Sequence, residues 1–144
     1  MVEVYTWWPS PPNIGHAAMM VSAGTSQQMY LSRWPGSLGA ALAMGPGLDN
    51  RYQDDVSSEG GNPSVVRLDG LDEDSMRDAV VAYQKSNLYS FFALNCATQV
   101  KMCLNAGVPA YVQIASFGLD LGSGPTCTPW GLYAWAKTLA AALY

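Results

Sequence analysis

The stretch HAAMMVSAGTSQQMYLSRWP, residues 16–35, decides the fold of this 144-residue chain. Residues 16–22 form an apolar run of the kind found in strands, a small and polar turn follows, and residues 29–34 return as a second strand. The stretch therefore predicts a β-hairpin. Counting outward from the turn places His16, at the open end of the hairpin, opposite residues 32–34.

The segments around the hairpin predict an α+β fold, in which one antiparallel sheet packs against helices. Further strands are expected over residues 2–6 and 65–69, and helices over residues 37–44, 72–86, 96–105 and 128–143. Residues 7–13 contain three prolines and predict an extended loop, while residues 49–63 are polar and predict a mobile surface loop. We expect a single domain, residues 1–144.

The composition bounds the class of protein. About half of the residues are apolar (49%) and only 12% are charged, as in a compact globular domain. The net charge is −4 and the seven basic residues are scattered, which argues against nucleic acid and anionic membranes as partners. The chain has neither a signal-peptide pattern at its start nor a run of about 20 apolar residues. We therefore expect no signal peptide and no integral membrane segment.

The cysteine and carboxylate patterns do not indicate a metal site. Three cysteines cannot form a complete disulfide framework, and no two of them have the short spacing of paired zinc ligands. Asp54, Asp55, Asp69, Asp72 and Asp74 lack the spacing of a calcium loop and are expected on the solvated surface. We therefore expect neither a metal nor another cofactor.

Cys96 follows Asn95 at the start of a predicted helix. Asn95 is a good N-cap, so the sulfur of Cys96 lies in the first turn, where unpaired N–H groups favour a thiolate and could donate to an oxyanion. The alternative is a small buried hydrophobic residue. Cys103 is expected in the core of the same helix, and Cys127 in a loop rich in Gly, Ser and Pro.

His16 is the only histidine of the chain and is therefore the only imidazole that could activate a thiol. The alternative is a structural histidine satisfied by hydrogen bonds. A third group should orient the imidazole through its second nitrogen. From the hairpin register we select Ser32 for this role, and the remaining candidates are Gln28, Tyr30, Arg33 and Gln99.

Aromatic residues lie close to His16 in this arrangement. Trp7, Trp8 and Trp34, together with Tyr5, could wall a substrate cleft or could simply pack the hairpin. Asn95 and Gln99, on either side of Cys96, are the polar candidates for substrate binding.

The order and spacing of these motifs resemble a known superfamily. Gly15-His16 leads an apolar strand, the next strand ends in Tyr-x-Ser-x-Trp-Pro, and an aromatic run later leads into Asn-Cys-Ala-Thr at residues 95–98. This pattern resembles the circularly permuted papain-like cysteine hydrolases of the NlpC type, in which the histidine strand precedes the cysteine helix. Similar small domains occur as bacterial type VI secretion effectors. The lecithin–retinol acyltransferase group shares the same order and an Asn-Cys motif.

The resemblance implies a permuted papain-like fold with Cys96 as nucleophile and His16 as general base. It implies a thiol peptidase or amidase toxin that cleaves amide bonds of peptidoglycan and is blocked by a cognate immunity protein. Such an effector would be delivered without a signal peptide to the periplasm of a target cell; otherwise the protein would be cytoplasmic. The alternatives are a lipid-directed acyltransferase or thioesterase, a deamidase or protease of host proteins, and a non-catalytic binding domain.

Overall fold

The computed structural model describes residues 1–37, 45–86, 88–90, 95–115 and 128–144. Its centre is a six-stranded sheet in the order β5-β1-β2-β3-β4-β6, in which every neighbouring pair is antiparallel. The strands are β1 (Val2–Trp7), β2 (His16–Val21), β3 (Met29–Pro35), β4 (Gly45–Asp49), β5 (Ser64–Leu68) and β6 (Leu88–Tyr89). The α+β class and the antiparallel sheet predicted from the sequence are confirmed.

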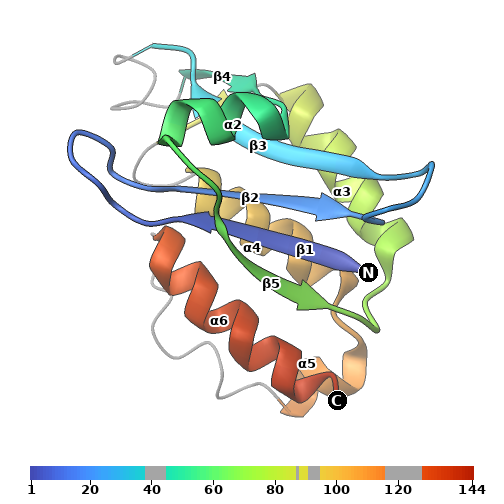
Figure 1. The fold of residues 1–144 in the computed structure, drawn as a ribbon. Helices are drawn as coiled ribbons and strands as arrows, with labels where there is room; N and C mark the ends of the chain where they lie inside the picture. Colours follow the sequence, from blue (N-terminus) through green and yellow to red (C-terminus); the bar gives the residue numbers. More distant parts are fainter. Residues whose placement is uncertain (38–44, 87, 91–94, 116–127) are drawn as a thin grey trace.

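Helices cover both faces of the sheet (Figure 1). The helices are α2 (Tyr52–Glu59), α3 (Glu73–Ser86), α4 (Cys96–Gly107), α5 (Ala110–Ala115) and α6 (Pro129–Ala142). Helices α3, α4 and α6 pack on one face, where their apolar side chains join those of the strands, and α2 packs on the other. In the described part of the chain, no helix is long and apolar enough to span a membrane.

The predicted hairpin is confirmed and consists of β2 and β3. Its register pairs Ala18 with Ser32 and Val21 with Met29, so continuing the ladder brings His16 opposite Trp34, within the predicted range. Strand β1 pairs with β2 on the other side, with Trp7 opposite His16. Because side chains alternate along a strand, His16, Ser32 and Trp34 share one face of the sheet.

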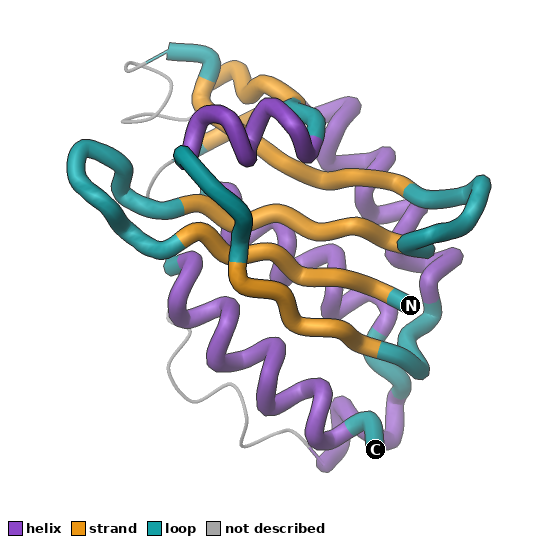
Figure 2. Tube along the Cα trace, in the orientation of Figure 1, coloured by secondary structure: helices purple, strands orange, loops and turns teal. Residues whose placement is uncertain are grey.

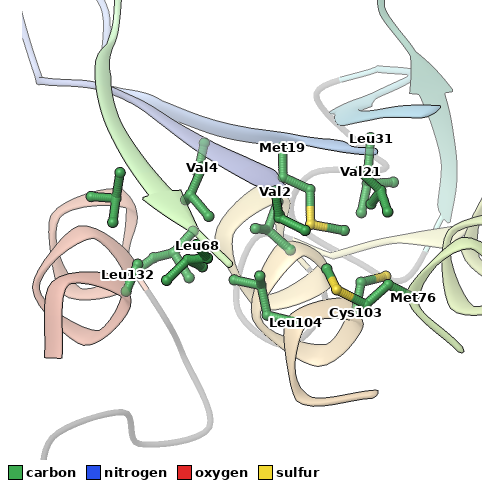
Figure 3. Close-up of a cluster of buried hydrophobic side chains, with 14 of the residues drawn as sticks. Val2, Val4, Met19, Val21, Leu31, Leu68, Met76, Cys103, Leu104 and Leu132 are labelled. Carbon is green, nitrogen blue, oxygen red and sulfur yellow. The ribbon is translucent and has the colours of Figure 1, made fainter. Parts of the chain in front are cut away.

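The main core lies between the sheet and the three helices of its larger layer (Figure 3). Alternate residues of the strands supply it, including Val4, Met19 and Leu31, all fully buried. The opposite face carries a smaller aromatic cluster, in which Tyr5 and Trp7 pack against α2. His16 therefore lies at the start of a strand that is covered on both faces by packed helices.

The predicted surface loop over residues 49–63 is wrong. This segment contains α2, which begins after Arg51 and ends at Gly60, a residue in the left-handed conformation with φ 77°. The helix lies on the sheet because its apolar residues Tyr52 and Val56 join the aromatic cluster. The sequence analysis did not predict β4, β6 or α5, and the helix expected over residues 37–44 lies almost entirely outside the described residues.

Candidate active site

His16 is held between two tryptophan rings at the start of β2. Its imidazole stacks on Trp34, with ring centroids 4.2 Å apart and an interplanar angle of 21°, and the centroid of Trp7 lies 5.6 Å away on a tilted ring. His16 is 1% exposed. The chain enters β2 through Gly15, whose φ is +92° and where a Cβ would lie 2.9 Å from the Trp7 carbonyl oxygen. Glycine therefore permits the close approach that places the ring.

The Nε2 atom of His16 has two polar neighbours. Ser32 Oγ lies 2.9 Å away, and Asp55 Oδ2 lies 3.4 Å away. The structure thus brings Ser32, the group selected from the sequence, to the imidazole. It also brings Asp55, which the sequence analysis placed on the solvated surface. That expectation is wrong, because Asp55 in α2 is fully buried against the sheet.

Three further donors hold the Asp55 carboxylate in place. The Tyr30 hydroxyl donates to Oδ2 at 2.6 Å, while Trp34 Nε1 and Asn50 Nδ2 donate to Oδ1 at 2.8 and 3.1 Å. Burial raises the pKa of Asp55. The hydrogen bond and the charge of His16 oppose this effect, as do hydrogen bonds from Ser32 and Tyr30, and the pKa of Asp55 lies far below its ordinary value. Asp55 is therefore a fixed, ionised carboxylate beside the imidazole.

Cys96 is the first residue of α4, and Asn95 caps the helix. The Thr98 N–H donates to the Asn95 side-chain oxygen at 2.9 Å, which confirms the predicted N-cap. The Cys96 side chain is buried and hydrogen-bonds to His16. The nucleophile and base proposed from the sequence are therefore in contact, although the residues come from distant parts of the chain.

The charge state of the imidazole follows from these neighbours. Burial lowers the pKa of His16, but the negative charge of Cys96 and hydrogen bonds with Asp55 and Cys96 outweigh it and raise the pKa to about 9. At neutral pH the imidazole is therefore protonated and lies in contact with the Asp55 carboxylate and the Cys96 side chain.

Tyr89 adds a hydroxyl to the site that the sequence analysis did not select. This buried residue of β6 accepts a hydrogen bond from the Cys96 backbone N–H. Burial and the charge of Cys96 raise the pKa of Tyr89, so the phenol stays protonated and can donate. Its only sequence signal was the aromatic run before Asn95, which is too general to identify a functional tyrosine.

The tryptophans chosen as substrate-binding residues occupy different positions. Trp7 and Trp34 flank the imidazole, and Trp7 Nε1 donates to the Gly61 carbonyl at 2.8 Å. Trp8 is 46% exposed and packs its ring edge-on against Tyr133, with centroids 5.2 Å apart. The structure therefore brings two of the three to His16.

The remaining candidates are engaged within the protein. Gln99 is fully buried and donates to the Leu88 carbonyl at 3.4 Å, and Asn95 serves as the cap. Of the rivals for the third position, Tyr30 bonds to Asp55, Arg33 pairs with Asp49, and Gln28 accepts from the Gly24 N–H. Cys103 is buried in the core, as expected, and burial raises its pKa to about 12. Cys127 lies outside the described residues.

Within the described ranges, no three His, Cys, Asp or Glu side chains gather as metal ligands would. Comparisons of the chain with protein-family models, with curated proteins and with solved structures gave no match. A thiol at a helix N-terminus, a buried imidazole and a buried carboxylate therefore lie together, and groups of this kind can activate a sulfur nucleophile.

Proposed function

We propose that this protein is a cysteine hydrolase of the papain-like type. The observation that carries the proposal is the hydrogen bond between the Cys96 thiol and His16, whose Nε2 is held in turn by the buried Asp55. In this proposal Cys96 is the nucleophile, His16 is the base that contacts it, and Asp55 is the carboxylate that orients the base, as a thiol hydrolase requires. Asp55, with Ser32 beside it, takes the third role that the sequence assigned to Ser32 alone.

The chemistry proceeds in two steps. The Cys96 thiolate attacks the carbonyl carbon of an amide, and protonated His16 gives its proton to the departing amine. The acyl group is then on sulfur, and His16 takes a proton from the water that hydrolyses the thioester. We propose that the Cys96 N–H and the hydroxyl of Tyr89, to which that N–H donates in the free protein, stabilise the oxyanion that develops in both steps.

The proposed substrate is an amide bond in the peptides of peptidoglycan. This assignment rests on the resemblance of residues 15–16 and 95–98 to NlpC-type domains. The same resemblance leads us to propose that the protein is a secreted effector, which reaches the periplasm of a target cell and is neutralised by a cognate immunity protein.

A second candidate, a lipid-directed acyltransferase or thioesterase, is favoured by the loop between β1 and β2. This loop projects from the end of the sheet at which His16 lies (Figure 2). Trp8 and Ile14 on this loop are 46% and 64% exposed. Exposed apolar side chains on a loop that adjoins the His16 end of β2 would suit an acyl chain.

Thiol reactivity decides whether the site is active. We expect iodoacetamide to label Cys96 much faster than Cys103, with a two-step pH profile that belongs to the coupled pair. In His16→Ala the lower step should disappear, and no other histidine can replace it. An unchanged profile would show that His16 is not coupled to the thiol, and the protein would then be a binding domain. Incubation with purified muropeptides and with phospholipid vesicles then separates the two substrate classes.

A further inference from the structure

Arg33 is a buried charged residue beside the site that the proposed mechanism leaves unused. It follows Ser32 in β3, so its side chain lies on the other face of the sheet, the face on which α4 packs. Arg33 is 1% exposed, and its Nη1 donates to Asp49, whose side chain is 46% exposed.

The other two nitrogens of Arg33 have no hydrogen-bond partner in the described part of the chain. Nε and Nη2 are buried, and neither has a hydrogen bond among the residues that the structure describes. These two atoms form one edge of the guanidinium, the edge to which a carboxylate binds through two parallel N–H···O bonds. Buried donors are rarely left unpaired, and such a pair calls for a ligand.

The position of this edge links it to the nucleophile. Gly47 lies beside the guanidinium, and a Cβ there would be 2.8 Å from Arg33 Nη2 and 3.3 Å from Tyr89 Cβ. The hydroxyl of that same tyrosine accepts from the Cys96 N–H. Gly47 is therefore a neighbour of both Arg33 and Tyr89, and Tyr89 reaches the backbone of Cys96.

We propose that Arg33 binds a carboxylate of the substrate, so that the preferred substrates of this site carry a free carboxylate near the acyl group that Cys96 attacks. The proposal rests on the proposed cysteine hydrolase function. Arg33 binds that carboxylate through Nε and Nη2. The other buried cation beside the site, His16, is already paired with Asp55 and Cys96, so Arg33 is the group that binds the substrate carboxylate.

Matched alkylating reagents test this inference. Bromoacetyl derivatives of glycine, 3-aminopropionate and 4-aminobutyrate place a carboxylate at increasing distances from the carbon that the sulfur attacks with loss of bromide. Each acid is compared with its primary amide. We expect the acid to react with Cys96 faster than the amide for at least one chain length. In Arg33→Gln this ratio should fall roughly tenfold or more.

Two variants keep the test independent of folding. Gly47→Ala introduces a methyl group against Nη2, which should displace the guanidinium and lower the same ratio. Arg51→Gln removes an equal charge from the exposed start of α2 and should leave the ratio unchanged. Acid-to-amide ratios that are the same in the native protein, Arg33→Gln and Gly47→Ala would overturn the proposal.

A binding measurement separates this proposal from the proposed hydrolase. In Cys96→Ala, the acetyl forms of the three acids should shift the Arg33 Nε–H resonance in ¹⁵N NMR, whereas the corresponding amides should not. A shift together with an unreactive Cys96 in the native protein would leave the carboxylate site standing and refute the hydrolase. Equal effects of acids and amides would refute the carboxylate site whatever Cys96 does.

Discussion

The Asp55 carboxylate lies 3.4 Å from Nε2 of His16, although one residue belongs to a helix on the face of the sheet and the other to a central strand. Both are buried, and each changes the pKa of the other in the direction that favours charge. The carboxylate, held at Nε2, therefore fixes the orientation of the imidazole.

Asp55→Asn should lower kcat by roughly 10²–10⁴-fold, because the amide no longer stabilises the imidazolium. The matched control is Asp54→Asn, at the neighbouring residue, whose side chain is 44% exposed; this variant should leave kcat unchanged. Steady-state kinetics of the two variants and of Ser32→Ala test this. A larger loss in Ser32→Ala than in Asp55→Asn would return the orienting role to Ser32.

Cys96→Ala should abolish hydrolysis and leave the fold intact, because the sulfur sits at the end of a helix. Cys103→Ala should retain activity but lose about 1 kcal/mol of stability, since it creates a small cavity in the core. Urea unfolding and an activity assay on both variants distinguish the two thiols. If only Cys103→Ala is inactive, the nucleophile has been assigned to the wrong cysteine.

Tyr89→Phe should lower kcat by roughly 10²-fold with little change in KM, because the hydroxyl would stabilise only the transition state. The ring remains, so the core packing and the unfolding midpoint should stay close to those of the native protein. A change confined to KM, or an unchanged kcat, would show that the Cys96 amide acts without the hydroxyl.

The stability of the protein should fall as the pH rises from about 6.5 to about 9. The pKa of His16 is raised in the folded state, from 6.5 to about 9. Its contribution is therefore complete below the unfolded value and is lost as the pH passes through the folded one. The full contribution is on the order of 3 kcal/mol.

Unfolding free energies measured in urea across this pH range test the contribution of His16. His16→Gln should be less stable at pH 6 and should lack this part of the slope. Cys96→Ala should retain a shallower slope, because the charge on Cys96 is one cause of the raised pKa. A slope of equal size in the native protein and in His16→Gln would assign the effect to other groups.

The hairpin and the cap at Asn95 could be predicted from the sequence because each depends on neighbouring residues. The apolar runs of β2 and β3 and the intervening turn fix a register that places His16 near Ser32 and Trp34. An asparagine before an apolar helix is likewise a local signal.

Asp55 could not be predicted, because its burial depends on tertiary contacts. It lies in a polar segment with Gly60 and Gly61, where a surface loop was the natural prediction, and its donors come from Tyr30, Trp34 and Asn50. The two-residue strand β6, which carries Tyr89, has no sequence pattern of its own and is defined by its pairing with β4.

The stacking of His16 on Trp34 gives the protein an internal optical indicator. A protonated imidazole in van der Waals contact with an indole accepts electron density from the excited indole and quenches the indole's emission, whereas a neutral imidazole quenches it weakly. With the rings 4.2 Å apart, the fluorescence of Trp34 should therefore brighten as His16 loses its proton. Acylation of Cys96 removes the charge that helps to keep the imidazole protonated, so the same emission would follow formation and hydrolysis of the thioester in real time, without an added dye.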